Sequence, residues 1–406
     1  MTVGTPGFVP ARLTEARESL GLTKVALSEL IDVTPTAVSQ YENGTSPRPD
    51  VLDQLSLKLG FPRSFFVRPT VAEDEAPIFW RSNAAATKLA RQRGLQRLKW
   101  SKEITAYLTE YFEFPKVDFP AELFSQIDFR ELTIEDIERT ADQMRQYWGF
   151  GQGPVPDLLL ELENCGAVTG RINMAAEHLD AFSQWATCIG VPFVLIGKDR
   201  ASAARSRFDA AHELGHLLLH KKVDRKRINS KEDFKLIEQQ AHRFAAAFLL
   251  PGKAFADELW TPSLDGFLAL KERWRVSIKM MIKRSETIGI TEKEESQRLY
   301  INYNRRGWLH EEPLDTVLKH EEPKILRRSF EALISEGIKS RQQILDDLAL
   351  PAREVEQLGG LPSGYLSGNQ AEVKAFPSLR EGVRLAGGES SGKVVNLFGR
   401  EKPKDG

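Results

Sequence analysis

The stretch RFDAAHELGHLLLH, residues 207–220, decides the fold of the middle of this chain. It contains the pattern His-Glu-x-x-His at His212, Glu213 and His216. On an α-helix, residues four apart lie on one face, about 6 Å apart along the axis. Both imidazoles can therefore reach the same metal ion, and the stretch predicts a helix that carries a metal site.

A buried stripe is predicted on this helix, because Phe208, Ala211, Gly215 and Leu218 recur at helical spacing. A glycine in mid-helix costs about 1 kcal/mol relative to alanine. We therefore expect another element to approach closely at Gly215. The best candidate is a helix over residues 234–250, which Pro251 would end.

Glu238 is unusual within that second helix, because it shares a face with Ala241, Ala245 and Phe248. A buried charge without a partner is costly, so a cation is expected beside it. Two histidines, one glutamate and a water form a known catalytic zinc set. We therefore expect His212, His216 and Glu238 to bind Zn²⁺. Glu213 would take a proton from the attacking water and pass it to the leaving amine.

The segments RFDAAHELGHLLLH and IEQQAHRFAAAFLLP resemble the ImmA/IrrE family of gluzincin-like metallopeptidases, with similarity from about residue 79 to 313. The resemblance implies a zinc endopeptidase with the same four site residues. The family usually has Asn where this chain has His242. We expect His242 to hydrogen-bond Glu238 from outside the ligand set, and replacement of Glu238 as ligand stays an alternative. His220 lies too far along the helix to reach the ion, so packing or hydrogen bonding is expected.

The N-terminal part predicts a helix-turn-helix. Thr23 can cap one helix, whose apolar residues Val25, Leu27 and Leu30 would face inward. Asp32 tolerates the left-handed backbone of a tight turn. Thr34 and Pro35 then favour the start of the next helix. The stretch GLTKVALSELIDVTPTAVSQYENGTSPRP, residues 21–49, resembles the XRE-type (Cro/C1-like) helix-turn-helix family.

Operator DNA is therefore an expected partner, and operator-binding domains of this type commonly act as homodimers. The residues expected to contact DNA are Lys24, Thr34, Thr36, Ser39 and Gln40. The alternative is an interaction or dimerisation module, because the net charge of −1 lacks the basic excess of most DNA-binding proteins. Residues 78–102 contain no acid and could add phosphate contacts, or simply form a solvated helix face. Their basic residues are Arg81, Lys88, Arg91, Arg93, Arg97, Lys99 and Lys102.

The expected fold class is mainly α with a small β-sheet (α+β). Strands are predicted at 166–172, 179–185 and 192–196, and the edge of their sheet could pair with an extended peptide. We expect five segments, in chain order: a helix-turn-helix domain (1–67), a helical linker with the basic stretch (68–125), the peptidase domain (126–262), a helical C-terminal region (263–375) and a disordered tail (376–406). Helix pairs in the C-terminal region fit either further helix-turn-helix units or packing helices.

Composition excludes several classes of protein. Charged residues make up 28% of the chain and hydrophobic residues 41%, and no apolar run is long enough to cross a bilayer. No secretory signal is recognisable at the N-terminus, so a cytoplasmic location without membrane partners is expected. The two cysteines form no Cys-x-x-Cys pair, which argues against a thiolate metal site.

These observations favour a DNA-binding regulator fused to a zinc endopeptidase that cleaves a repressor protein and so controls stress, mobile-element or defence genes. One alternative is a transcription factor whose peptidase-like domain only senses a metal or ligand. Another is one component of a toxin-antitoxin pair. The intact His-Glu-x-x-His pattern weighs against the sensor.

Overall fold

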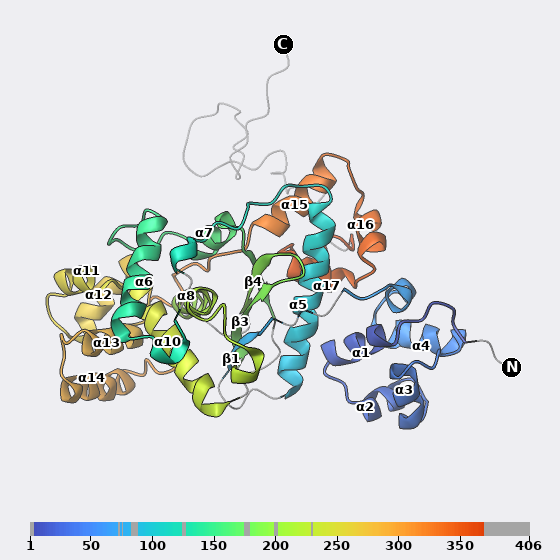
Figure 1. The fold of residues 1–406 in the computed structure, drawn as a ribbon, viewed down its shortest axis with the longest axis horizontal. Helices are drawn as coiled ribbons and strands as arrows, with labels where there is room; N and C mark the ends of the chain where they lie inside the picture. Colours follow the sequence, from blue (N-terminus) through green and yellow to red (C-terminus); the bar gives the residue numbers. More distant parts are fainter. Residues whose placement is uncertain are drawn as a thin grey trace, which may run out of the picture. The chain divides into compact units, whose positions relative to one another are not determined.

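The structure is a computed structural model of the whole chain. It describes residues 4–368 apart from 72–73, 75, 83–87, 124–126, 174–178, 199–201 and 229. The tail expected to be disordered, 376–406, lies outside the described residues. Helices dominate and surround one small sheet (Figure 1), so the predicted fold class is confirmed.

The sheet has four strands in the order β1-β3-β4-β2. β1 (Phe79–Ser82) and β4 (Val191–Gly197) both pair antiparallel with β3 (Leu179–Ala186). β2 (Val168–Ile172) pairs parallel with β4. The three predicted strands are present. β1 was not predicted, because four residues within a basic stretch give little periodic signal, and it adds a strand inside the segment expected to be a helical linker.

One face of the sheet packs on α5 (Lys88–Thr109). A Cβ atom built on Gly94 of this helix would lie 2.9 Å from the ring of Trp80 and 3.2 Å from that of Phe182, so only glycine allows this approach. The opposite face packs on α8 (Ala203–Leu219), where Trp185 Nε1 donates to the carbonyl of Leu217 at 3.0 Å. The sheet therefore separates two hydrophobic cores.

The second core brings α10 (Lys231–Leu249) against α8 at the predicted place. A Cβ on Gly215 would lie 3.0 Å from Phe244 Cδ1 and 3.3 Å from Ala241 Cα. The close approach expected from this glycine is confirmed. Other helices that complete this core are α6 (Ile134–Tyr147), α7 (Leu158–Asn164), α11 (Gly252–Glu258), α12 (Leu264–Trp274), α13 (Ile278–Thr287) and α14 (Lys293–Arg305).

The N-terminal helices are α1 (Pro10–Ser19), α2 (Lys24–Leu30), α3 (Pro35–Glu42) and α4 (Pro49–Leu59), followed by the 3₁₀ turn η1 (Arg63–Val67). Thr23 and Thr34 cap α2 and α3 through their hydroxyls, and Asp32 has a φ of 53°. The predicted helix-turn-helix is thus confirmed in its caps and its turn.

The predicted inward face of α2 is wrong in part. Leu27 is fully buried, but Val25 is 52% exposed and Leu30 is 39% exposed. α2 has only seven residues, and the side that it turns inward carries Leu27 and Ser28. Apolar spacing over so short a helix does not define its buried side.

A buried ion-pair cluster joins α1 to α5. Arg12 Nη1 lies 2.8 Å from Glu15 Oε2 and 2.7 Å from Glu103 Oε1, and all three side chains are at most 4% exposed. Trp100 of α5 donates to Glu15 at 3.4 Å. Since a buried charge needs its partners, the contact between α1 and α5 depends on this cluster.

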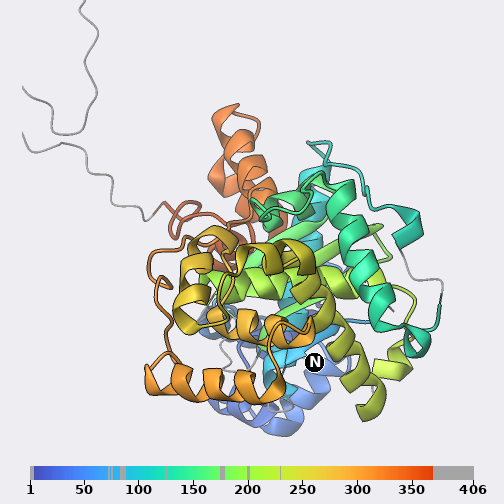
Figure 2. The same cartoon turned by 90° about the vertical axis from the view of Figure 1, so that its left-hand side faces the viewer.

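The remaining helices are the short α9 (Arg225–Ile228), then α15 (Ile325–Ser335), α16 (Arg341–Leu348) and α17 (Ala352–Leu358), the last three seen at the top of Figure 2. Two helix pairs of the C-terminal region contain the same kind of turn as Asp32: φ is 53° at Arg275 between α12 and α13, and 53° at Ala349 between α16 and α17. α17 contributes Val355 and Leu358 to the core shared with α5, so this helix packs inward.

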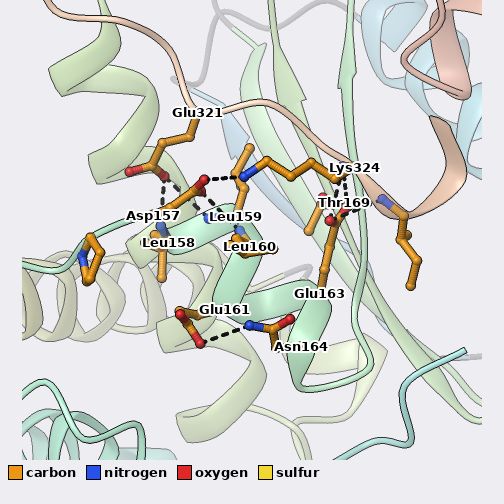
Figure 3. A network of polar contacts seen from close by, with 12 residues as sticks. Asp157, Leu158, Leu159, Leu160, Glu161, Glu163, Asn164, Thr169, Glu321 and Lys324 are labelled. Atoms are coloured by element: carbon orange, nitrogen blue, oxygen red, sulfur yellow. Dashed lines mark hydrogen bonds and ion pairs between the residues drawn. The ribbon is translucent and has the colours of Figure 1, made fainter. Parts of the chain in front are cut away.

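Figure 3 shows how the chain before α15 is tied to α7. Glu321 accepts hydrogen bonds from the backbone N–H groups of Leu158 and Leu159, the first residues of α7, at 2.9 and 3.3 Å. Glu163, near the end of α7, in turn accepts from the backbone of Lys324 at 3.0 Å. Carboxylates at helix N-termini satisfy N–H groups that have no partner within the helix.

The cores cross the segment boundaries expected from the sequence, because one core contains residues of the N-terminal helices, α5, the sheet and α15–α17. The five segments themselves stay a prediction. Among the described residues, no helix is both long and apolar enough to cross a membrane.

Candidate metal centre

Two helices bring three predicted ligands together. α8 carries His212 and His216, which are fully buried, and α10 carries Glu238, whose side chain is 16% exposed. His216 Nε2 lies 3.0 Å from His212 Nε2 and 3.1 Å from Glu238 Oε1. His212 Nε2 lies 3.4 Å from Glu238 Oε2. The three side chains therefore converge on one point.

These separations fit a zinc ion. Zinc binds histidine nitrogen and carboxylate oxygen at about 2.0–2.2 Å in tetrahedral sites, which puts neighbouring donor atoms roughly 3.3 Å apart. The three measured separations lie between 3.0 and 3.4 Å. Two imidazoles and one carboxylate are also donors that zinc prefers.

The charge state of Glu238 agrees with a ligand role. Burial raises the pKa of this carboxyl, but contacts with His212 and His216 lower it more strongly, and the resulting pKa lies well below the ordinary value for glutamate. The side chain is therefore a carboxylate, the form that binds a metal.

His216 is held by a relay of buried side chains. His216 Nδ1 lies 3.0 Å from His220 Nδ1, and His220 Nε2 lies 2.9 Å from Gln240 Oε1. Gln240 Nε2 donates to the backbone carbonyl of Phe129 at 2.5 Å, so its oxygen faces His220. Burial lowers the pKa of His220 to about 3, which keeps this ring neutral.

The relay sets the tautomers of both rings. Because Gln240 accepts, the proton of His220 sits on Nε2, and His220 Nδ1 accepts a hydrogen bond from His216 Nδ1–H. The lone pair of His216 Nε2 then points toward Glu238 Oε1, 3.1 Å away. Two lone pairs at this distance are stabilised by a cation between them. The hydrogen-bonding role expected for His220 is confirmed. Gln240 was not predicted, because the sequence does not distinguish a buried glutamine from an exposed one.

Replacing Gln240 with leucine should weaken metal binding about 10- to 100-fold, the usual cost of losing a partner behind a ligating histidine. His220 would lose its acceptor and no longer hold His216 with Nε2 unprotonated. Metal affinity can be measured by competition with a chromophoric chelator. Gln240→Glu keeps an acceptor oxygen and should restore most of the affinity.

Gln239→Leu is the matched control, because Gln239 is an exposed neighbour on the same helix. It should leave metal affinity unchanged. If Gln239→Leu and Gln240→Leu weaken binding equally, the relay has no role in positioning His216.

Glu213 lies apart from this donor set. It is fully buried on α8, and Ser183 of β3 donates a hydrogen bond from Oγ to Glu213 Oε2 at 2.5 Å. The hydroxyl fixes the direction of a carboxylate that makes none of the ligand contacts above. Ser183 was also missed, although a serine among the apolar residues of a buried strand is a recognisable signal.

His242 takes a position that the sequence left open. Its Nδ1 lies 2.8 Å from the backbone oxygen of Glu238, one helical turn earlier. The ring is exposed, with its centroid 4.5 Å from that of His212. Donor atoms of His212, Glu238 and His242 lie within 4.8 Å of one another. His212 and Glu238 therefore belong to two possible sets of metal ligands, one completed by His216 and the other by His242.

β1 borders the metal centre. The ring of Phe79 stacks on His216 with 4.6 Å between centroids and 11° between planes. β1 is the end strand of the sheet, so among the described residues its outer edge is paired with no strand. This edge of the sheet therefore lies next to the metal centre.

The residues expected to contact DNA occupy one part of the helix-turn-helix. Thr36 and Gln40 of α3 are exposed and Ser39 is half-buried. Thr34 accepts the backbone N–H of Ala37 at 3.1 Å as a helix cap. Lys24 is 41% exposed in its side chain and pairs with Glu42 at 3.0 Å.

Several cations of the basic stretch are engaged inside the protein. Arg93 donates to the carbonyl of Leu20 at 3.1 Å, and Arg97 lies 3.3 Å from Glu354. Lys102 donates to Gln184 at 2.7 Å. These three side chains are therefore not exposed phosphate contacts, and the side chain of Arg81 lies outside the described residues.

Comparison with protein families supports both halves of the sequence interpretation. A model described as the IrrE N-terminal-like domain, of the M78 peptidases, matches residues 162–286. A helix-turn-helix model matches residues 13–66. None of the curated proteins matches the chain. Residues 162–286, which contain the complete candidate metal centre, are therefore similar to the IrrE-like peptidase domain, and residues 13–66 are similar to a helix-turn-helix domain.

Proposed function

We propose that this protein is a zinc-dependent endopeptidase that cleaves a repressor protein, and that its helix-turn-helix binds operator DNA at the genes it controls. The observation that carries the proposal is the convergence of His212, His216 and Glu238, with Glu213 held nearby on the same helix. The match to an IrrE-like peptidase domain supports it.

His212, His216 and Glu238 would hold the metal ion, which when bound supplies a Lewis acid that polarises a carbonyl and activates water. His242 would stand beside this set. The relay behind His216 keeps its Nε2 unprotonated and correctly aimed.

Glu213 would act as the general base and acid. Ser183 donates to its Oε2 and so orients the carboxylate, which would accept a proton from the attacking water through Oε1. The same oxygen would later return the proton to the amine of the departing peptide. The buried position of this carboxylate strengthens its electrostatic action at the reacting carbonyl.

An extended substrate peptide would add to the outer edge of β1. Backbone hydrogen bonds to an edge strand hold a peptide in a defined register without regard to its sequence. The stacking of Phe79 on His216 puts this edge beside the metal centre, so a peptide held there would present a carbonyl to the site.

The test is incubation of the purified protein, loaded with zinc, with repressor proteins encoded near its gene. Cleavage of one of them at a defined bond, abolished by a chelator and restored by zinc, is the expected outcome. If no repressor is cut while loss of the metal ligands His212, His216 or Glu238 still changes reporter expression, the domain senses a metal or ligand and does not cleave.

Gln40→Ala should relax the preference for one operator by about 1–3 kcal/mol, because an exposed glutamine near the start of a recognition helix reads base edges. Lys24→Ala should weaken binding to all DNA sequences to a similar degree, since phosphate contacts carry no sequence information. Mobility-shift titrations with specific and scrambled duplexes separate the two effects. Unchanged DNA binding in both variants would make the N-terminal part an interaction module. Homodimers and a cytoplasmic location remain predictions.

A further inference from the structure

The side chains around the metal centre differ in their exposure to solvent. His212 and His216 are fully buried on α8, and the side chain of Glu238 is 16% exposed. His242, one helical turn after Glu238 on α10, is exposed. A hydrated ion that arrives from solvent can therefore contact His242 and Glu238 before it contacts the buried imidazole of His216.

His242 is held in the form that binds a metal. Its Nδ1 lies 2.8 Å from the backbone oxygen of Glu238. A carbonyl only accepts, so Nδ1 carries the proton, and in the neutral ring Nε2 carries the lone pair. A hydrogen bond from one ring nitrogen to a backbone carbonyl commonly decides which nitrogen binds a metal.

His242 also lies beside two of the predicted ligands. Its ring centroid is 4.5 Å from that of His212, and donor atoms of His212, Glu238 and His242 lie within 4.8 Å of one another. Neighbouring donors of a tetrahedral zinc ion are roughly 3.3 Å apart, so shifts of at most about 1.5 Å would let this set hold the ion. We call these three residues the entry set, and His212, His216 and Glu238 the buried set.

We propose that zinc enters the metal centre through the entry set. The ion first binds His242, Glu238 and His212, and then its bond to His242 breaks as a bond to His216 Nε2 forms. His212 and Glu238 hold the ion throughout this exchange. The inference rests on the metal centre of the proposed function and not on peptide cleavage, and it adds the entry path that a buried metal site needs.

The buried set is the final position because His216 is held in place. Its ring stacks on Phe79, and its Nδ1 is bonded to His220. A ligand that is already fixed loses little conformational freedom when it binds, whereas the exposed ring of His242 loses more. An entry ligand that leaves the ion afterwards speeds uptake and release equally, since the equilibrium affinity does not depend on the path.

The experiment measures the rates of zinc binding by the full-length protein. Metal-free protein is mixed with Zn²⁺ in a stopped-flow instrument, and a fluorescent zinc indicator reports the loss of free ion. Release is measured with a chelator and extrapolated to zero chelator. His242→Ala should slow uptake and release about tenfold each, the effect of one lost contact in the transition state, and change the affinity less than about twofold.

His310→Ala is the matched control, because His310 is an exposed histidine outside residues 162–286. It should change neither rate. Equal slowing by the two variants would overturn the proposal, and so would unchanged rates in His242→Ala. Faster release with unchanged uptake would also overturn it, because His242 would then be a permanent ligand.

A second variant, His216→Ala, tests the entry set directly. It should still bind one zinc ion, more weakly, and adding His242→Ala should lower its affinity at least about tenfold, against less than twofold in the normal protein. Equal effects in the two backgrounds would overturn the proposal. Circular dichroism checks the fold of His216→Ala, and the rates of His242→Ala decide if this variant does not fold.

The rates also separate this proposal from the proposed function. If zinc uptake depends on His242 but no repressor is cleaved, the entry proposal stands and the peptidase proposal fails. If a repressor is cleaved but His242→Ala binds and releases zinc at the normal rates, the entry proposal fails and the peptidase proposal stands.

Discussion

Glu213→Gln should abolish measurable proteolysis, with a loss of about 10²- to 10⁴-fold in rate, while zinc content and fold stay unchanged. The amide cannot take a proton from water or return one to the leaving amine. It still offers an oxygen to the Ser183 hydroxyl, which lies 2.5 Å from the carboxylate. Cleavage of a repressor is followed by gel and mass spectrometry, and zinc by atomic absorption.

Glu232→Gln is a matched control, because Glu232 is an exposed glutamate in the first turn of α10. It should cleave at the normal rate. DNA binding should persist in both variants, since it depends on residues of the helix-turn-helix. A Glu213→Gln protein that retains zinc and regulates its promoter normally would show that peptide cleavage is not the working step.

Glu238→Ala should weaken zinc binding by at least about 100-fold, and His242→Ala should weaken it far less. Glu238 has its carboxylate oxygens 3.1 and 3.4 Å from the Nε2 atoms of His216 and His212. Its loss removes a ligand and the negative charge that offsets the ion. His242 is exposed, and its Nδ1 lies 2.8 Å from the backbone oxygen of Glu238. A chelator competition assay gives both affinities.

The reverse order would make His242 the third ligand, because the donor set of His212, Glu238 and His242 is also compact. A double variant separates the cases. If His242→Ala has no further effect in the Glu238→Ala background, the two residues act through one site. Glu232→Ala, on the same helix, should leave zinc affinity unchanged.

The sequence was enough to predict the features that depend on residues close together in the chain, such as helical spacing, helix caps and tight turns. His212, Glu213 and His216 share a helix, so a spacing of four residues already places both imidazoles together. The caps at Thr23 and Thr34 and the left-handed turn at Asp32 are also decided within a few residues of each other. The three other strands are long enough to be recognised, whereas the four residues of β1 are too few to give a periodic pattern.

Tertiary structure alone decided which distant groups meet. Ser183 reaches Glu213 because β3 packs on α8, and Gln240 supports His216 only through the second helix and His220. The cations of the basic stretch looked equivalent in the sequence, yet Arg97 pairs with Glu354 and Arg93 donates to the carbonyl of Leu20. Helical spacing tells which side chains share a face, but not what packs against that face. That information comes from the tertiary structure, which packs α5 on one face of the sheet and α8 on the other, and α10 against α8.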